Sequence, residues 1–275
     1  MKRTLSTSTK SFATIVFSAI MFASCQKSTL NPADAVPAET PAKDKPTAIS
    51  ALAANTINFS GYTWTVRSTS AGTQGPGPNY WNSSNAWLDA NGHLHLKMQK
   101  DAQGHWSCAE VTSANTFGYG TYQWKIECDL NNIDRNLVLG LFTYSGQDGY
   151  DEQDIELSRW GNPSAGQFNY TVYPAQSGVR YKNVHWNTAN ITMNGTFSTH
   201  RFTRNKTASI VYESQHGHYD AGSSIARKIF TSSDITLSAL NMPVLMNLWL
   251  MNGTAPVNGQ SYEVIIHEFK FTPLP

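Results

Sequence analysis

The amino-acid sequence predicts an all-β fold of two packed antiparallel sheets, and three observations lead to this prediction. Short runs rich in β-branched and aromatic residues alternate with period two, as in residues 62–66, 93–98 and 121–126. Turn signals made of glycine, proline and asparagine separate these runs, for example at residues 75–78 and 91–92. No segment carries the apolar periodicity of a long amphipathic helix.

Length and composition limit the size and class of this fold. The chain has 275 residues, and its first ~52 residues lack the patterning of a domain, so about 220 remain, enough for one β-sandwich. Hydrophobic residues make up 40% and charged residues 14%, which excludes a disordered chain and a coiled coil. The formal net charge is +1 without any run of Lys and Arg, so we expect no nucleic-acid partner.

The N-terminus has the features of an export signal. Residues 1–24 start with basic residues and contain an apolar run, 12–23, that is too short to span a bilayer permanently. The sequence Phe-Ala-Ser before Cys25 resembles a bacterial lipobox, which implies lipidation of Cys25 and a lipid-anchored place in the bacterial cell envelope, at the outer membrane or cell surface. Ordinary signal cleavage is the alternative. The composition of residues 25–52 predicts a disordered tether, followed by a folded domain at 53–275.

The strongest chemical signal is a row of acidic residues at 151–156, which read Asp-Glu-Gln-Asp-Ile-Glu. On a strand, Glu152, Asp154 and Glu156 all point to one face. Like charges in a row repel, so stability alone does not favour this arrangement. Glycoside hydrolysis needs two carboxyl groups beside the glycosidic bond, which makes these three residues catalytic candidates. An exposed acidic strand and a set of calcium ligands are the alternatives.

This segment resembles the signature of glycoside hydrolase family 16, the laminarinase, lichenase and xyloglucan-active family. That signature reads Glu-x-Asp-x-Glu, usually with Ile or Val at the first x. Four further segments resemble strands of the same family in the expected order: residues 108–122, 140–144, 167–170 and 246–249. The resemblance therefore extends over roughly residues 56–273.

The resemblance implies a concanavalin A-like β-jelly-roll sandwich with a sugar cleft on one sheet. It implies that Glu152 is the nucleophile, Glu156 the general acid/base and Asp154 their electrostatic support, with no cofactor required for catalysis. The implied reaction is endo-hydrolysis of a β-linked polysaccharide, in the first place a β-glucan, through a covalent glycosyl-enzyme. A glycan-binding lipoprotein without turnover is the alternative. Laminarin, xyloglucan and marine galactans stay open as substrates.

Five residues are candidates for substrate binding: Tyr150, Trp160, Asn169, Asn247 and Trp249. Tyr150 and Trp160 bracket the acidic strand and could stack on sugar rings, although Trp160 could equally pack a loop. Asn169 lies on the strand expected next to the acidic one and could hydrogen-bond a sugar hydroxyl. Asn247 shares a strand face with Trp249, which the resemblance puts near the cleft.

Two cysteines and one glutamate leave open questions. Cys108 and Cys128 flank a hairpin that is expected to turn near residue 118, which would set them on neighbouring strands. A disulfide and a pair of free buried thiols are both compatible with that arrangement. Glu110 matches a glutamate of the family, but the sequence does not decide whether it faces the cleft.

Three departures from the family pattern bear on the site. Gln153 replaces the usual Ile or Val and would point between the sheets, where an unpaired amide costs on the order of 1–3 kcal/mol. Arg201 or Arg204 stands near the place where the family often has a sugar-facing Trp. Many members have a late Asp that contributes to a structural calcium site. His267 takes its place here, which leaves the metal content open and calcium in doubt.

Overall fold

The computed structural model describes residues 55–69 and 71–275. The predicted signal (1–24), tether (25–52) and lipidated Cys25 lie outside these described residues. No helix of the described part is long and apolar enough to cross a membrane. The described residues form β-strands and two short 3-10 turns, η1 (Ser83–Asn85) and η2 (Met251–Gly253).

The strands run in chain order as follows: β1 (Thr56–Phe59), β2 (Tyr62–Val66), β3 (Tyr80–Trp81), β4 (Ala86–Leu88), β5 (Leu94–Lys100), β6 (Trp106–Phe117), β7 (Gly120–Glu127), β8 (Leu137–Thr143), β9 (Gln153–Ser158), β10 (Phe168–Val172), β11 (Val184–Asn187), β12 (Phe197–Asn205), β13 (Ser209–His216), β14 (Ala226–Thr231), β15 (Met242–Leu250) and β16 (Tyr262–Pro273). The three runs identified from alternation coincide with β2, β5 and β7, so those sequence predictions are confirmed.

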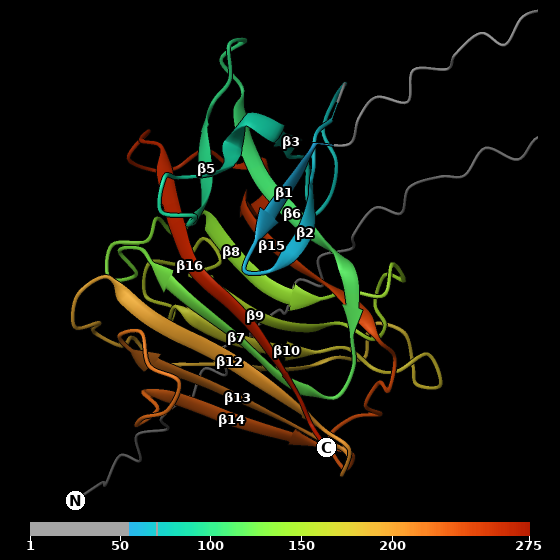
Figure 1. The fold of residues 1–275 in the computed structure, drawn as a ribbon. Helices are drawn as coiled ribbons and strands as arrows, with labels where there is room; N and C mark the ends of the chain where they lie inside the picture. Colours follow the sequence, from blue (N-terminus) through green and yellow to red (C-terminus); the bar gives the residue numbers. More distant parts are fainter. Residues whose placement is uncertain (1–54, 70) are drawn as a thin grey trace, which may run out of the picture. The chain divides into compact units, whose positions relative to one another are not determined.

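The strands form two layers that pack face to face (Figure 1). The first layer has the order β11-β10-β9-β8-β15-β6, and the second has the order β5-β16-β7-β12-β13-β14. Short pairing between β5 and β6 joins the layers at one end. The two layers are also joined by side-chain hydrogen bonds. In one of them, the Tyr212 hydroxyl donates to the Thr171 carbonyl at 2.9 Å. All pairs are antiparallel except β3 with β6. The predicted all-β jelly-roll sandwich is confirmed.

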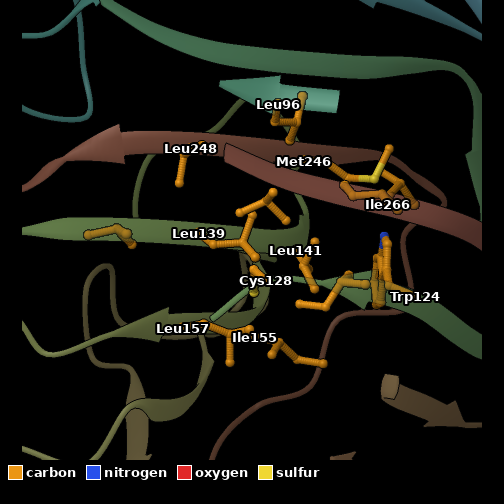
Figure 2. Close-up of a cluster of buried hydrophobic side chains, with 14 of the residues drawn as sticks. Leu96, Trp124, Cys128, Leu139, Leu141, Ile155, Leu157, Met246, Leu248 and Ile266 are labelled. Carbon is orange, nitrogen blue, oxygen red and sulfur yellow. The ribbon is translucent and has the colours of Figure 1, made fainter. Parts of the chain in front are cut away.

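The core fills the space between the two layers. Alternation turns Ile155 and Leu157 of β9 inward, where they are fully buried. Leu248 of β15 and Trp124 of β7 are buried in the same cluster (Figure 2). Because alternate residues of a strand point to opposite faces, the first layer presents a second face away from the core. We call this second face the carboxyl face, because Glu152, Asp154 and Glu156 lie on it.

The expected hairpin at residue 118 is wrong. Strand β6 pairs with β15, β2 and β5, whereas β7 pairs with β12 and β16, so the chain crosses from one layer to the other between them. Gly120 allows this corner, because a Cβ there would lie 2.4 Å from the Phe271 ring. Cys108 and Cys128 consequently sit in different layers, and both are free and buried.

The expected position of the two arginines is also wrong. Strand β12 belongs to the second layer, so neither Arg201 nor Arg204 lies on the carboxyl face. Arg204 points into the sandwich, where its guanidinium donates to the carbonyls of Ser238 and Leu240 at 3.0 and 2.9 Å. Arg201 points outward and donates to the Tyr219 carbonyl at 3.1 Å. The sequence alone could not show which layer this strand joins.

Gln153 is buried on the core side of β9, as its position predicts, and its amide is paired. The Thr143 hydroxyl, directly opposite on β8, donates to Gln153 Oε1 at 2.9 Å. Gln153 Nε2 donates to the Asp151 carbonyl. The polar side chain therefore fits a core position without the cost of an unsatisfied group.

Candidate active site

The three carboxyl side chains lie together on the carboxyl face of a central strand. Asp154 and Glu156 belong to β9, and Glu152 directly precedes it. Alternation with buried Gln153, Ile155 and Leu157 directs all three carboxyl groups to one face. The Cα atoms of Glu152 and Glu156 are about 13 Å apart along the strand. Glu152 and Glu156 remain partly exposed, while Asp154 between them is only 4% exposed.

Burial makes charge on these groups unfavourable. Desolvation raises the pKa of Glu156 to about 8, and the neighbouring charge of Glu152 adds to the rise. Desolvation also raises the pKa of Glu152 to about 7, but a hydrogen bond with Asp154 opposes this rise. The pKa of Asp154 lies well above its ordinary value because of desolvation and the charges of both glutamates. The hydrogen bond between the two side chains favours the proton on Asp154 and negative charge on Glu152.

Two tyrosines beside these carboxyls were not found from the sequence. The backbone N–H of Tyr173 donates to the Glu152 carbonyl at 2.8 Å. Burial raises the pKa of the Tyr173 phenol, and the charges of Asp154, Glu152 and Glu156 raise it further. Tyr144 donates its hydroxyl to Asp148 at 2.6 Å, and its pKa is also raised by burial. Tyr173 follows Asn169 by four residues, so period-two alternation along β10 could have identified it.

A row of directly opposed residues crosses the carboxyl face at the level of Glu156. From β6 to β11, the row consists of Glu110, Asn247, Gly140, Glu156, Asn169 and Asn187. Residues directly opposite each other share a face of a sheet. Glu110 therefore lies on the carboxyl face, which the sequence did not decide.

Asn247 and Glu110 are joined in this row. Asn247 Nδ2 donates to Glu110 Oε2 at 3.1 Å, and Asn247 is almost fully buried. Its Oδ1 has no hydrogen-bond partner among the described residues. A Cβ on Gly140 would lie 2.4 Å from this oxygen, so the glycine makes room for the amide next to Glu156. The structure thus brings Asn247 to the neighbourhood that the sequence indicated.

Asn169 also lies in the row, but its amide is used inside the protein. Asn169 Nδ2 donates to the carbonyls of Glu156 and Ser158 at 3.1 and 2.9 Å, and its Oδ1 accepts from Asn187 Nδ2 at 2.7 Å. The side chain is 0% exposed. This differs from the expectation that Asn169 hydrogen-bonds a sugar hydroxyl. Its contacts instead fix the backbone of β9 around Glu156.

Trp160 and Trp249 form a pair beside the row. Trp249 lies two residues beyond Asn247 on β15 and is 9% exposed. Trp160 lies in the turn after β9, with φ of 51°, and its ring centroid is 6.2 Å from that of Trp249 in an edge-to-face arrangement. Trp160 also packs against the core cluster, which agrees with the loop-packing interpretation. Only partial surfaces of these rings remain open to a ligand.

Tyr150 lies in the loop before β9 and is half-buried. Its backbone N–H donates to the Gln147 carbonyl at 3.1 Å, while Asp151 beside it adopts a positive φ of 64°. The loop thus changes direction between Tyr150 and the strand. No hydrogen bond or ring contact found in residues 55–69 and 71–275 joins the Tyr150 side chain to the carboxyl groups.

At the position where many family members have a calcium-binding Asp, this chain has a group of histidines. Calcium prefers six to eight oxygen ligands. His267 Nε2 lies 3.0 Å from a Glu127 carboxylate oxygen, and its ring centroid is 4.2 Å from that of His93 and 4.7 Å from that of His218. In the described part of the chain, no three His, Cys, Asp or Glu residues are arranged to hold a metal ion.

A cavity of about 400 Å³ opens on another part of the fold. It lies between the turn that joins β1 to β2 and strand β16, and its lining includes Ser60, Tyr62, His267 and Lys270. None of the candidate catalytic or substrate-binding residues lines it. The chemistry-bearing residues therefore belong to the carboxyl face and not to this cavity.

Part of the sequence resembles proteins of known activity. The chain is 32% identical over 93 residues to a beta-glucanase from Bacillus subtilis (strain 168), covering 33% of this chain and 37% of that relative. It is 27% identical over 113 residues to a beta-glucanase from Bacillus amyloliquefaciens, covering 40% and 46%. The chain thus spans less than half the length of these curated relatives. No family model matches the chain.

The fold resembles solved structures over a larger part of the chain. A beta-glucanase from Bacillus licheniformis matches with a TM-score of 0.56 at 20% identity, over 77% of this chain and 92% of that one. A glycoside hydrolase family 16 endo-glucanase from Bacteroides ovatus, in complex with G4G3G-2F-DNP, matches with a TM-score of 0.58 at 14% identity, over 76% and 94%. The fold is that of family 16 glucanases, and sequence and fold together support the family resemblance.

Replacing Glu156 by Gln is expected to stabilise the full chain at pH 7. Burial raises the pKa of Glu156, so near pH 7 folding must either bury a charged carboxylate or take up a proton, and both cost free energy. Below the unfolded pKa of about 4.5 the carboxyl is protonated in both states, and this cost disappears. The amide removes this cost, so the free energy of unfolding should rise on the order of 1–3 kcal/mol at pH 7 and much less at pH 4. Urea denaturation at both pH values measures the difference.

The matched control for this stability measurement is Glu213→Gln. Glu213 lies on β13 in the second layer and pairs with Arg227 at the surface. This substitution should change stability by less than about 0.5 kcal/mol at either pH. A loss of stability in Glu156→Gln at pH 7, or an equal gain at both pH values, would contradict the desolvation argument.

Proposed function

We propose that the chain is a surface-tethered, endo-acting glycoside hydrolase of family 16 that cleaves a β-linked polysaccharide, in the first place a β-glucan, with retention of configuration. The observation that carries the proposal is the row of three desolvated carboxyl groups on one face of β9. Such a row is unfavourable for folding, so a chemical use accounts for it. Similarity to named beta-glucanases supports the substrate class.

The difference between the two glutamates supports their roles in the first step. Glu152 accepts a hydrogen bond from Asp154, which favours its ionised form, and an ionised carboxylate can attack the anomeric carbon. Glu156 has the higher pKa, which favours the protonated form needed to donate to the leaving oxygen. The bond from the anomeric carbon to Glu152 forms as the glycosidic bond breaks. The proton of Glu156 leaves with the departing sugar.

The second step reverses these roles. Glu156, now ionised, takes a proton from water, and the resulting oxygen nucleophile displaces Glu152 from the anomeric carbon. Two inversions give net retention. Asp154 supports both steps, because its proton stabilises negative charge on Glu152 whenever that carboxylate is free.

Two departures from the family pattern do not disturb the candidate site. Gln153 was an unusual residue for an active strand, but its amide is paired in the core. Neither Arg201 nor Arg204 occupies a sugar-facing position, because β12 lies in the second layer. We therefore do not retain a non-catalytic glycan-binding protein as a second candidate, and it becomes an outcome of the activity test.

The tethered location rests on the sequence of residues 1–52. A basic start, a short apolar run and a Cys at position 25 are typical of a bacterial lipoprotein signal. Lipid on Cys25 would hold the enzyme at the cell envelope, in contact with polymers too large to import. Polysaccharide and membrane are then its two partners.

The full chain is expected to release reducing ends from at least one polymer in a panel of soluble β-glucans and galactans. Glu152→Gln should lose this activity on the order of 10³-fold or more, equivalent to about 4 kcal/mol of transition-state stabilisation. The control Glu213→Gln should retain it. Proton NMR of the first products should show the β-anomer if configuration is retained.

Two results of the activity test would reject parts of this proposal. A first product in the α-configuration would reject the retaining mechanism. Equal binding of one polymer by the wild-type protein and by Glu152→Gln, without cleavage of any polymer, would establish the binding-only alternative.

The dependence of kcat/KM on pH should be bell-shaped, with its maximum between about 7 and about 8. Activity falls as pH drops below the raised pKa of Glu152, because the nucleophile becomes protonated. It falls as pH rises above the raised pKa of Glu156, because the acid loses its proton. Initial rates at low substrate concentration measure both limbs. An alkaline limb that persists unchanged in Glu156→Gln would contradict this assignment.

Replacing Cys25 by Ser is expected to abolish lipid attachment. Cells expressing the wild-type chain should incorporate labelled palmitate into the protein and hold it in the membrane fraction. The Cys25→Ser variant should do neither, while Cys108→Ser serves as a control because that thiol is buried in the fold. Equal labelling of Cys25→Ser and wild type would reject the anchor.

A further inference from the structure

Arg67 reaches the carboxyl face, although no sequence pattern pointed to it. It directly follows β2, and its backbone N–H donates to the Glu110 carbonyl at 2.9 Å. Its Nη1 donates to Glu110 Oε1 at 3.0 Å, and its Nη2 donates to Gln74 Oε1 at 3.3 Å. The guanidinium carbon lies 4.2 Å from the centroid of the Trp81 ring. Backbone, ion pair and stacking together hold this side chain in one place.

The pair of Arg67 and Glu110 continues the row that contains Glu156. Glu110 lies opposite Asn247, Asn247 opposite Gly140, and Gly140 opposite Glu156. Three strand spacings separate Glu110 from Glu156, which amounts to about 14 Å. A polysaccharide that crosses the strands at Glu156 therefore reaches Arg67 with a sugar several units away from the bond that is cut.

In this ion pair, Glu110 is buried and Arg67 is partly exposed to solvent. Burial raises the pKa of Glu110, and Arg67 and Asn247 oppose this rise. The Glu110 side chain is 8% exposed, whereas that of Arg67 is 25% exposed. Arg67 is therefore the member of the pair that a ligand can touch. A guanidinium has five N–H donors, and hydrogen bonds to Glu110 and Gln74 leave others free.

Stacking on Trp81 determines what kind of surface a sugar would meet here. Trp81 is buried, with its ring against the Arg67 guanidinium, so its own face is not offered to a ligand. The exposed surface is a charged donor held rigid on an aromatic ring. Hydroxyl groups of a neutral sugar accept hydrogen bonds from such a donor.

We propose that Arg67 is a specificity-determining residue that donates hydrogen bonds to sugar hydroxyls several units from the cleaved bond. The inference rests on the proposed function and names the part of the site that recognises longer β-glucan chains. Arg67 also orders its neighbours, because Glu110 in turn holds the Asn247 amide. We therefore expect Arg67 to make the protein bind longer oligosaccharides more tightly than shorter ones.

The test uses the full chain and linear β-1,3-1,4-gluco-oligosaccharides from a disaccharide to a hexasaccharide. In Arg67→Met, which keeps an apolar stem over Trp81, KM for the longest substrates should rise at least about tenfold, or about 1.4 kcal/mol. Values of kcat should stay within about twofold, and the shortest cleaved substrate should show no change in KM. The matched control Arg201→Met alters an arginine on the second layer and should leave both constants unchanged.

A double variant separates sugar contact from a purely structural role. Arg67→Met alone leaves Glu110 buried without its cation, which can disturb the fold. Arg67→Met with Glu110→Gln removes both charges and that disturbance. If the guanidinium touches sugar, the rise in KM persists in the double variant. If Arg67 only neutralises Glu110, the double variant regains the wild-type KM, and the proposal is overturned.

Failure of this inference is distinguishable from failure of the proposed function. Wild-type cleavage with an unchanged length profile in Arg67→Met overturns the role of Arg67 alone. Absence of cleavage by the wild type overturns the proposed function, and the inference falls with it. Thermal unfolding of each variant shows whether a change in KM accompanies a loss of fold.

Discussion

The period-two alternation of β9 is the constraint on which the rest of the structure depends. Residues 152–157 must place Ile155 and Leu157 in the core and three acids on the opposite face. Because β9 lies between β8 and β10, its backbone hydrogen bonds are protected at both edges. The three carboxyl groups on its outer face are largely desolvated. The strand therefore carries carboxyl groups whose charge is unfavourable in the folded state. The same unfavourable environment gives them the proton affinities that acid–base chemistry near neutral pH requires.

The strands next to β9 carry polar side chains and a glycine at the positions that border its carboxyl groups. Gly140 on β8 leaves space beside Glu156, and Asn247 fills it from β15. On the other side, Asn169 binds the backbone of β9 and thereby fixes the direction of Glu156. Arg67 closes the row with a cation, which offsets the burial of Glu110. The carboxyl face is thus a continuous polar layer on a hydrophobic sandwich, with each buried polar group dependent on its neighbour.

Local patterns in the sequence predicted the strands and the acidic face, because alternation is a property of a few adjacent residues. The same reasoning failed at the corner after β6, since a Tyr-Gly turn reads alike whether the chain folds back or crosses to another layer. It also failed for Arg201 and Arg204, whose role depends on the layer that β12 joins. Arg67 could not be found, because its partners Glu110, Gln74 and Trp81 are related by tertiary packing alone. Tyr173 could have been predicted from alternation, because it lies four residues after Asn169 and therefore on the same face.

The order of strands has a consequence for how the protein forms. Strand β15 is inserted between β6 and β8, and β16 between β5 and β7, so the last two strands complete both layers. Until these C-terminal residues are available, neither layer has a continuous ladder and the core has no closed side. Contacts of such long sequence separation form slowly, because loop-closure entropy opposes them. A chain that still lacks these C-terminal residues is therefore kept by its own topology from completing either layer.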